Sequence, residues 1–358
     1  MIGLSIEFIE KLSNAFGVAG FEKEVADIAE NIANEFATVK RDKMDNLYLK
    51  WSKEKQKPLK VLLDAHLDEV GFIVQAIRPN GMLDFLPVGG WVIHNVPAHM
   101  VQIKTEEGQK IKGITASTPP HFMSDADKGK PLDFDALVID VGTSSKEETE
   151  ALGIRIGDPV VPDVLFEELN NGELLLGKAF DNRIGSAALL ETMREFSKEA
   201  DKHEVEVVGA LTTQEEVGLR GAKLVASQTN ADLAIVFEGC PADDTFTPDY
   251  KVQSALRKGP MLRDFDVSMI THPGFQKFAL GIAEKYGTKV QRSVRKGGGT
   301  NGAAYHLSNE GIPTIVVGIP VRYAHTHYGF VAYEDYQAAV ELVLNILREL
   351  DVEVYDRL

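Results

Sequence analysis

Histidines and carboxylates follow apolar runs at widely separated points of the chain. His66 comes directly after VLLDA, and His325 comes directly after IVVGIPVRYA. Acids in comparable places are Asp181 in GKAFDNRIG, the pair Glu215 and Glu216 after VEVVGALTTQ, and Glu238 after LAIVF. Ligand sites of open α/β sheets lie beyond the carboxyl ends of the strands, so these groups are expected to meet in one pocket. Imidazoles and carboxylates together bind divalent metals, which predicts a metal-dependent hydrolase.

The set is large enough for two metal ions. A dinuclear site needs about three protein ligands per metal, one of them shared, with positions left open for water and substrate. The predicted ligands are His66, Asp181, Glu216, Glu238 and His325. A bridging Asp181 would give each metal two terminal ligands and one shared oxygen. Two cations stabilise hydroxide near neutral pH, so a metal-bridging hydroxide is the expected nucleophile.

The adjacent glutamates offer both a ligand and a general base. Consecutive side chains of extended backbone point in opposite directions, so one of Glu215 and Glu216 can bind metal while the other moves a proton from water to the leaving amine. Asp68 lies two positions after His66 and is placed to accept the second ring N–H of an imidazole ligand. Such a carboxylate orients the ring and raises its basicity.

Each residue taken alone has an ordinary structural explanation. A single acid is usually solvated surface, Asp181 can be a helix cap, and a histidine at a strand end is often a hydrogen-bonded core group. His327 competes with His325, because both rings would share one face if residues 325–327 were a strand. The cluster Lys296–Gly302 is either a backbone cradle for an anion or a flexible turn that leads into a helix.

Composition restricts the class of partner. The formal net charge of −16 argues against nucleic acid and anionic membranes, which require basic patches. The single cysteine, Cys240, excludes an internal disulfide and fits a reducing compartment. The first residues contain acids within their apolar stretch, unlike a signal peptide, and no apolar run approaches the length of a membrane span. We therefore expect a cytoplasmic protein.

Periodicity predicts an α/β domain interrupted by a β-rich block. Helical spacing is expected from Phe21 to Val39, from Arg183 to Lys198, over Pro273–Lys285 and in a C-terminal helix around residues 336–347. Expected strands of the same domain are Asn46–Trp51, Lys60–Ala65, Val205–Leu211, Leu233–Phe237 and Thr314–Ile319. Between them, hairpins around Pro79-Asn80-Gly81 and Glu106-Glu107-Gly108 indicate a small barrel or sandwich.

Five motifs together resemble the tetrahedral-aminopeptidase family, which includes glutamyl-aminopeptidase-like and cellulase-M-like proteins. They are AHLDEVGF (65–72), GKAFDNRIG (177–185), TTQEEVGLRGA (212–222), RKGGGTN (295–301) and GIPVRYAHTH (318–327), in the family's order. The resemblance implies a three-layer αβα peptidase domain, residues 1–73 and 163–358, interrupted by a PDZ-like β-barrel dimerisation domain, residues 74–162.

The resemblance also implies a site and an activity. His66 and Glu238 would hold one metal and Glu216 and His325 the other, with Asp181 bridging them. Glu215 would be the catalytic base and Asp68 would support His66. Zinc or cobalt is the expected metal, with manganese as a further option, and the expected reaction removes N-terminal residues from short peptides. Members commonly form dodecamers, so the resemblance also implies a homo-oligomer, a dodecamer built from dimers.

Two positions depart from the family pattern. Glu238 stands where relatives often have aspartate, so its longer side chain is expected to bind bidentately or to shift a metal. Asn301 stands where many members have aspartate, and contacts on the substrate side are expected to change there. Arg220 and Arg257 are candidates for recognising acidic side chains, with solvated surface or a structural ion pair as the alternative.

Other functions remain open from the residues alone. A glycoside hydrolase (endoglucanase-like) needs two carboxyls that flank the scissile bond, for which adjacent glutamates are a poor pattern. An inactive peptide-binding assembly would use the inserted β domain instead. An amidase or deacylase would share the metals and accept blocked N-termini.

Overall fold

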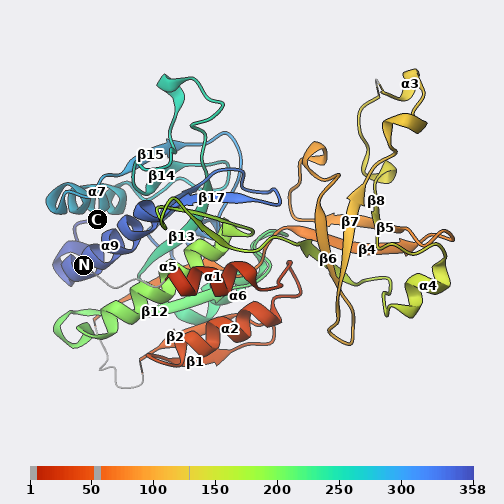
Figure 1. Ribbon diagram of the computed structural model, residues 1–358. Helices are drawn as coiled ribbons and strands as arrows, with labels where there is room; N and C mark the ends of the chain where they lie inside the picture. Colours follow the sequence, from red (N-terminus) through yellow and green to blue (C-terminus); the bar gives the residue numbers. More distant parts are fainter. Residues whose placement is uncertain (1–5, 52–57, 129) are drawn as a thin grey trace.

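A three-layer α/β unit and a separate β-barrel make up the protein (Figure 1). The computed structural model describes residues 6–51, 58–128 and 130–358. The central sheet of the larger unit has eight strands. In spatial order they are β1 (Thr38–Arg41), β2 (Leu47–Lys50), β12 (Val205–Thr212), β3 (Leu59–His66), β13 (Leu233–Pro241), β16 (Thr314–Val321), β14 (Met261–Phe265) and β15 (Gln291–Val294).

The four middle strands, β12, β3, β13 and β16, run parallel to one another. All four are almost fully buried, as expected for strands covered by helices on both faces. The register pairs Thr212 at the end of β12 with His66 at the end of β3. The carboxyl ends of neighbouring strands therefore meet at one edge of the sheet.

Helices cover both faces of this sheet. The larger apolar core contains side chains from α1 (Ile6–Asn14), α2 (Lys23–Ala33), α5 (Phe180–Ser197), α7 (Pro273–Tyr286) and α9 (Tyr333–Glu349). A smaller core beneath the opposite face contains side chains from α6 (Arg220–Thr229) and α8 (Gly302–Tyr305). The short helix α10 (Val352–Tyr355) packs against the larger core.

The barrel is closed and lies beside the α/β unit (Figure 1). Its strands in order are β4 (Gly71–Ile77), β5 (Leu83–Val88), β8 (Val138–Asp140), β7 (Lys110–Ala116), β6 (Met100–Lys104) and β9 (Pro159–Pro162). Two short helices, α3 (Asp125–Lys128) and α4 (Lys146–Ala151), lie in its loops. A small sheet of β10 (Glu167–Leu169), β11 (Leu174–Gly177) and β17 (Gly329–Ala332) completes the strands.

The predicted fold class is confirmed: a mixed α/β protein whose three layers are interrupted by a barrel. Both predicted hairpins are present, as β4–β5 and β6–β7. The helix expected from Phe21 to Val39 is shorter, because residues 38–41 form β1 and pair with β2. Pairing with a distant strand overrides the local periodicity there. None of the helices in the described residues is both long and apolar enough to cross a membrane.

Candidate metal centre

The predicted site residues come together at the carboxyl edge of the parallel strands. His66 ends β3, and Glu238 lies within β13. Glu215 and Glu216 follow β12 in a turn, and His325 follows β16 in another turn. The remaining group, Asp181, is near the start of α5, where the backbone has not yet become helical.

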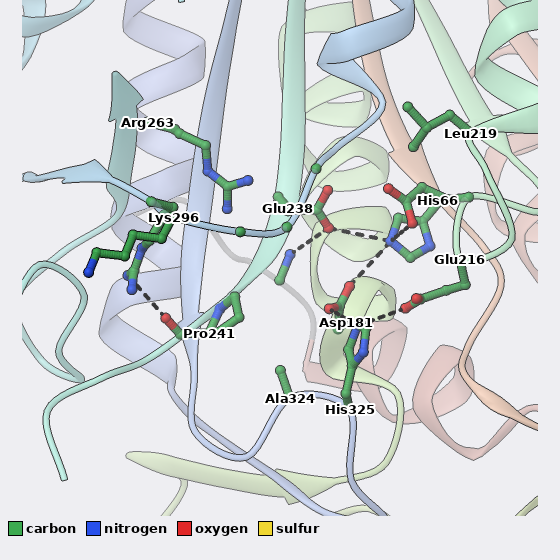
Figure 2. Close-up of a pocket in the computed structure, with 16 residues that line it drawn as sticks. His66, Asp181, Glu216, Leu219, Glu238, Pro241, Arg263, Lys296, Ala324 and His325 are labelled. Atoms are coloured by element: carbon green, nitrogen blue, oxygen red, sulfur yellow. Dashed lines mark hydrogen bonds and ion pairs between the residues drawn. The ribbon is translucent and has the colours of Figure 1, made fainter. Parts of the chain in front are cut away.

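All six side chains line one cavity of about 530 Å³, shown in Figure 2. Asp181 lies between the two histidines. The distance from His66 Nε2 to Asp181 Oδ1 is 3.2 Å, and from His325 Nε2 to Asp181 Oδ2 is 3.3 Å. Each oxygen of this carboxylate therefore faces a different imidazole, as a bridging ligand requires.

A second carboxylate accompanies each histidine. Glu238 Oε1 is 3.4 Å from His66 Nε2, and Glu216 Oε1 is 3.3 Å from His325 Nε2. Glu215 Oε2 is farther from His66 Nε2, at 3.9 Å. Donor atoms within 4.8 Å of one another form three overlapping groups: His66, Asp181 and Glu238; His66, Glu215 and Glu216; and Asp181, Glu216 and His325.

The ring orientation of both histidines is fixed by backbone carbonyls. His66 Nδ1 is 3.1 Å from the carbonyl oxygen of Asp68, and His325 Nδ1 is 2.8 Å from that of Gly90. A carbonyl only accepts hydrogen bonds, so both Nδ1 atoms carry hydrogen and a neutral ring presents its Nε2 lone pair to the carboxylates. This is the tautomer that a metal ligand needs.

The side chain of Asp68 accepts hydrogen bonds from the loop that carries Glu215 and Glu216, which we call the glutamate loop. Its Oδ1 accepts from the Glu215 N–H at 2.9 Å and its Oδ2 from the Glu216 N–H at 3.0 Å, while Oδ1 is 3.4 Å from His66 Nδ1. The two glutamates therefore sit in a turn, and not on extended backbone as expected. Both side chains reach the same cavity, although they approach different histidines.

Sequence reasoning missed Glu22, which holds the preceding residue of that loop. Glu22 is buried at the start of α2, and its Oε1 accepts from the N–H groups of Gly20 at 2.8 Å and Gln214 at 2.9 Å. Gln214 has a φ of 56°, a left-handed conformation that needs such support. A glutamate just before a helix gives no local signal of this role.

The charges of the six side chains described above, which we call the cage, suit the binding of a cation. They are His66, Asp181, Glu215, Glu216, Glu238 and His325. Glu238 Oε2 is buried without a hydrogen-bond partner among the described residues, and the buried Glu216 Oε1 has only its 3.3 Å contact with His325 Nε2. Burial raises the pKa of Glu238 to about 7, although His66 opposes that rise. Burial lowers the pKa of His325, but Asp181 and Glu216 outweigh it and bring this pKa to about 11. Divalent cations bound between these groups would neutralise the buried carboxylates and accept the lone pairs of the imidazoles.

Several other candidates lie outside the cavity. His327 is buried and stacks on His99 with ring centroids 4.0 Å apart, because residues 323–327 form a turn and not a strand. The Cys240 thiol is buried beside Ser254 Oγ at 3.4 Å, and burial raises its pKa to about 11. Arg257 pairs with Glu173, and Arg220 Nη1 donates to Gln214, so neither arginine lines the cavity.

The glycine cluster contributes in two ways. Lys296 and Gly297–Gly299 line the cavity, whereas Asn301 is buried behind it. Asn301 Nδ2 donates to Asp64 Oδ2 and to Thr212 Oγ1, each at 2.8 Å. The expectation that Asn301 alters contacts on the substrate side is therefore wrong. The amide donates to a buried carboxylate beneath the site, which an aspartate could do only if protonated.

The cavity also has lining residues that were not predicted. They are Leu219, Gly239, Pro241, Arg263, Arg295 and Ala324. Arg263 belongs to β14, whose sequence MLRDF looks like an ordinary amphipathic strand. Arg295 directly precedes the cluster Lys296–Gly302, for which either an anion cradle or a flexible turn was expected.

Comparisons with known proteins show the family of this chain. The family model described as M42 glutamyl aminopeptidase matches residues 45–342. A putative aminopeptidase of Escherichia coli, FrvX, is 33% identical over 98% of this chain and 97% of its own. A glutamyl aminopeptidase of Lactococcus lactis is 30% identical over 96% of each chain, and a lysyl aminopeptidase of Pyrococcus furiosus is 30% identical over 96% and 97%.

Solved structures show the same likeness. A TET aminopeptidase from a marine sediment thaumarchaeote superposes with a TM-score of 0.94 at 35% identity, covering 98% of both chains. The TET1 peptidase of Pyrococcus horikoshii, described as assembling into a tetrahedron or an octahedral shell, has a TM-score of 0.85 at 30% identity, covering 96% and 99%. A Thermotoga maritima structure described as an endoglucanase has a TM-score of 0.76 at 25% identity, covering 97% and 98%. The chain belongs to the M42 glutamyl aminopeptidase family, the predicted family of tetrahedral aminopeptidases.

Proposed function

We propose that this protein is an aminopeptidase that uses two divalent metal ions to remove N-terminal residues from short peptides. The observation that carries the proposal is the placement of Asp181 between His66 and His325, with one oxygen toward each ring. Membership of an aminopeptidase family supports the reaction class.

His66 and Glu238 would hold one metal, and Glu216 and His325 the other, with Asp181 shared between them. The bound cations would polarise the scissile carbonyl and lower the pKa of a water molecule. Zinc, cobalt and manganese all suit a set of carboxylate and imidazole ligands. Asp68 keeps both His66 and the glutamate loop in place through the contacts described above.

Glu215 is the proposed general base. It lines the cavity, yet its carboxylate is the farthest from His66 Nε2 of the three acids beside that ring. Burial raises the pKa of Glu215 well above its usual value, although the nearby imidazole of His66 opposes that rise. A carboxylate with a raised pKa both takes a proton from the attacking water and passes it to the departing amine.

The clustering of the acids favours this reaction over glycoside hydrolysis, although one structural neighbour is described as an endoglucanase. The acids surround two imidazoles, within the 4.8 Å groupings described above. Glycoside hydrolysis instead needs two carboxyls, roughly 5–9.5 Å apart, that flank the scissile bond, and it has no use for the two imidazoles. An inactive peptide-binding assembly would need neither metal ligands nor a general base. The presence of candidates for both therefore favours an enzyme.

We also propose a homo-oligomer, a dodecamer built from dimers in which residues 74–162 act as a dimerisation domain. The support is the TET1 neighbour, which is described as forming a tetrahedron. Exposed apolar side chains on the barrel, such as Val92, Met100 and Ile114, agree with a contact surface there. Light scattering of the purified protein tests the proposed mass.

A panel of aminoacyl-p-nitroanilides tests the function, run on metal-stripped protein and on protein reloaded with zinc, cobalt or manganese. We expect hydrolysis only after reloading, and only when the α-amine is free. N-acetylated substrates provide the control, because an amidase or deacylase would cleave them. Bound metal without hydrolysis of any member of the panel would contradict the proposal.

A further inference from the structure

One wall of the cavity carries positive charge that the proposed reaction does not use. Arg263, Arg295 and Lys296 line the same cavity as the carboxylate cage. The family relatives do not explain this wall, because two of them with equal identity are named for substrates of opposite charge, glutamyl and lysyl. The side-chain preference of this chain must therefore be read from its own cavity.

Arg263 is a buried guanidinium with spare hydrogen-bonding capacity. Its side chain is 5% exposed, and its Nη1 donates to Asp266 Oδ2 at 3.0 Å. Its Nε is buried without a partner among the described residues. Asp266 does not line the cavity, so the aspartate anchors the arginine from behind. Figure 2 shows the guanidinium pointing into the cavity on the side of Glu238.

Arg295 and Lys296 extend this wall. Arg295 Nη1 is held by Asp243 Oδ2 at 2.9 Å, and Asp243 also lies outside the cavity lining. Lys296 is exposed and has no ion pair within the described ranges. The three glycines after Lys296 add no side chains, so a ligand can approach these cations closely.

The charge balance leaves this wall available to an anion. The cage has four carboxylates, Asp181, Glu215, Glu216 and Glu238, and two divalent cations would bring four negative charges to zero. Asp266 and Asp243 offset two of the three cations of the wall, so one net positive charge remains facing the cavity. A ligand that places a carboxylate there gains charge-assisted hydrogen bonds in a partly buried site.

The position of the wall indicates which carboxylate it binds. Arg263 and Glu238, one of the proposed metal ligands, line the same cavity, and Figure 2 shows the guanidinium on the Glu238 side, so the wall begins beside the cage. In the proposed reaction the substrate's α-amine binds at the cage. An anion this close to the amine belongs to the side chain of the same residue more readily than to the far end of a peptide.

We propose that Arg263, Arg295 and Lys296 bind the side-chain carboxylate of the substrate's N-terminal residue, so that glutamyl and aspartyl peptides are preferred. The inference rests on the proposed aminopeptidase function. These three residues then determine specificity, whereas the residues of the cage act on the scissile bond.

Matched substrates test the inference on the metal-loaded full chain. Glutamyl- and glutaminyl-p-nitroanilide have nearly the same shape and differ in charge. We expect kcat/KM to favour the glutamyl substrate by about 10- to 100-fold, the usual worth of hydrogen bonds to a charged group. Calorimetric titration with free L-glutamate and L-glutamine should show the same order of affinity. Equal values for the two members of each pair would overturn the inference.

Variants locate the effect. Lys296→Met should lower the glutamyl-to-glutaminyl ratio about twofold to fivefold, as expected for an exposed charge. Arg263→Gln should lower it by about tenfold, and Arg263→Lys, which keeps the charge opposite Asp266, should retain more of the ratio. Arg292→Gln is the matched control, because Arg292 pairs with Asp264, is 59% exposed and lies outside the cavity lining. An unchanged ratio in both Lys296→Met and folded Arg263→Gln would refute the assignment.

Two further results distinguish a failure of the proposed function from a failure of the specificity inference. Failure to hydrolyse any anilide would contradict the proposed function itself, whereas faster hydrolysis of leucyl or lysyl than of glutamyl substrates would remove the specificity alone. Leu-Gly and Leu-Gly-amide distinguish the other source of a carboxylate. A strong preference for the free dipeptide, with equal rates on the two anilides, would show that the wall binds a peptide C-terminus and would overturn the inference.

Discussion

At the scale of single residues, the proposed chemistry depends on two neighbouring glutamates that have different surroundings. Glu216 contacts His325 at 3.3 Å, whereas Glu215 is 3.9 Å from its nearest imidazole nitrogen. Their backbone N–H groups bind the two oxygens of one buried aspartate, so the loop cannot exchange their positions. The proposed division of labour, with Glu216 as metal ligand and Glu215 as base, thus follows from how the loop is anchored.

Glu215→Gln tests this division. The amide keeps the size of the side chain but cannot accept the proton of water, so kcat should fall on the order of 10²- to 10⁴-fold. Metal content, measured by mass spectrometry of the dialysed protein, should stay at the wild-type stoichiometry. Loss of one metal per chain in this variant would identify Glu215 as a ligand instead.

At the scale of elements, short buried contacts connect distant segments to the catalytic loops. Three consecutive N–H groups, those of Gln214, Glu215 and Glu216, each bind a buried carboxylate oxygen. One of these carboxylates, Glu22, comes from the start of α2 and touches neither the cavity nor a proposed ligand side chain. We therefore assign Glu22 a positioning role for the loop of the base.

Glu22→Ala should lower kcat about tenfold, because a small displacement of a catalytic group slows the reaction steeply. KM and metal content should change little, since the cavity and the ligands remain. Glu22→Gln retains the carbonyl-type oxygen that accepts from Gly20 and Gln214, and it should restore most of the rate. Equal losses in the alanine and glutamine variants would contradict a positioning role based on these hydrogen bonds.

Gly90 links the barrel segment to the proposed metal ligand His325. A Cβ added at Gly90 would lie 3.1 Å from His325 Nδ1, so Gly90→Ala must displace the ring by a few tenths of an ångström. We expect about tenfold weaker binding of one of the two metals, as for other changes behind a ligand, measured by competition with a chromogenic chelator. Gly281→Ala, with open space around its Cβ, is the control. Unchanged affinity of both metals would show that the ring tolerates the contact.

Some of these elements can be predicted from the sequence, whereas the roles of several residues cannot. The strands that end at His66 and lead to Glu216 and His325 were visible because buried parallel strands read as apolar runs. The roles of Glu22 and Arg263 were not, because they depend on partners far away in sequence, Gln214 and the cavity. His327 was ambiguous for the same reason: only the turn that follows β16 directs its ring toward His99.

At the scale of the whole molecule, ion pairs join the barrel to the α/β unit. Glu24 of α2 accepts from Lys104 of β6 at 2.9 Å and from Lys110 of β7 at 2.8 Å. Burial raises the pKa of Glu24, but these lysines and the Phe16 N–H outweigh it and lower this pKa from 4.5 to about 2. The interface is therefore stabilised by an ionised carboxylate.

Glu24→Gln should reduce the free energy of unfolding by about 1 kcal/mol at pH 7, because the pairs are partly exposed. A depressed pKa stabilises the fold above the unfolded-state pKa, and this contribution is lost as the pH falls from about 4.5 toward 2. The difference in the free energy of unfolding between wild type and Glu24→Gln, measured by urea unfolding, should therefore become smaller as the pH falls over that range. A constant difference down to the lowest pH at which the protein remains folded would contradict the ion-pair origin.

The most direct measurement of the central claim is anomalous X-ray scattering from crystals of zinc-loaded protein. We predict two anomalous peaks per chain, one on each side of Asp181, each about 2.0–2.3 Å from its ligand atoms. His66 and Glu238 should ligate the first ion, and Glu216 and His325 the second. Absence of peaks from this cavity in fully loaded protein, or ions bound only elsewhere, would contradict the account.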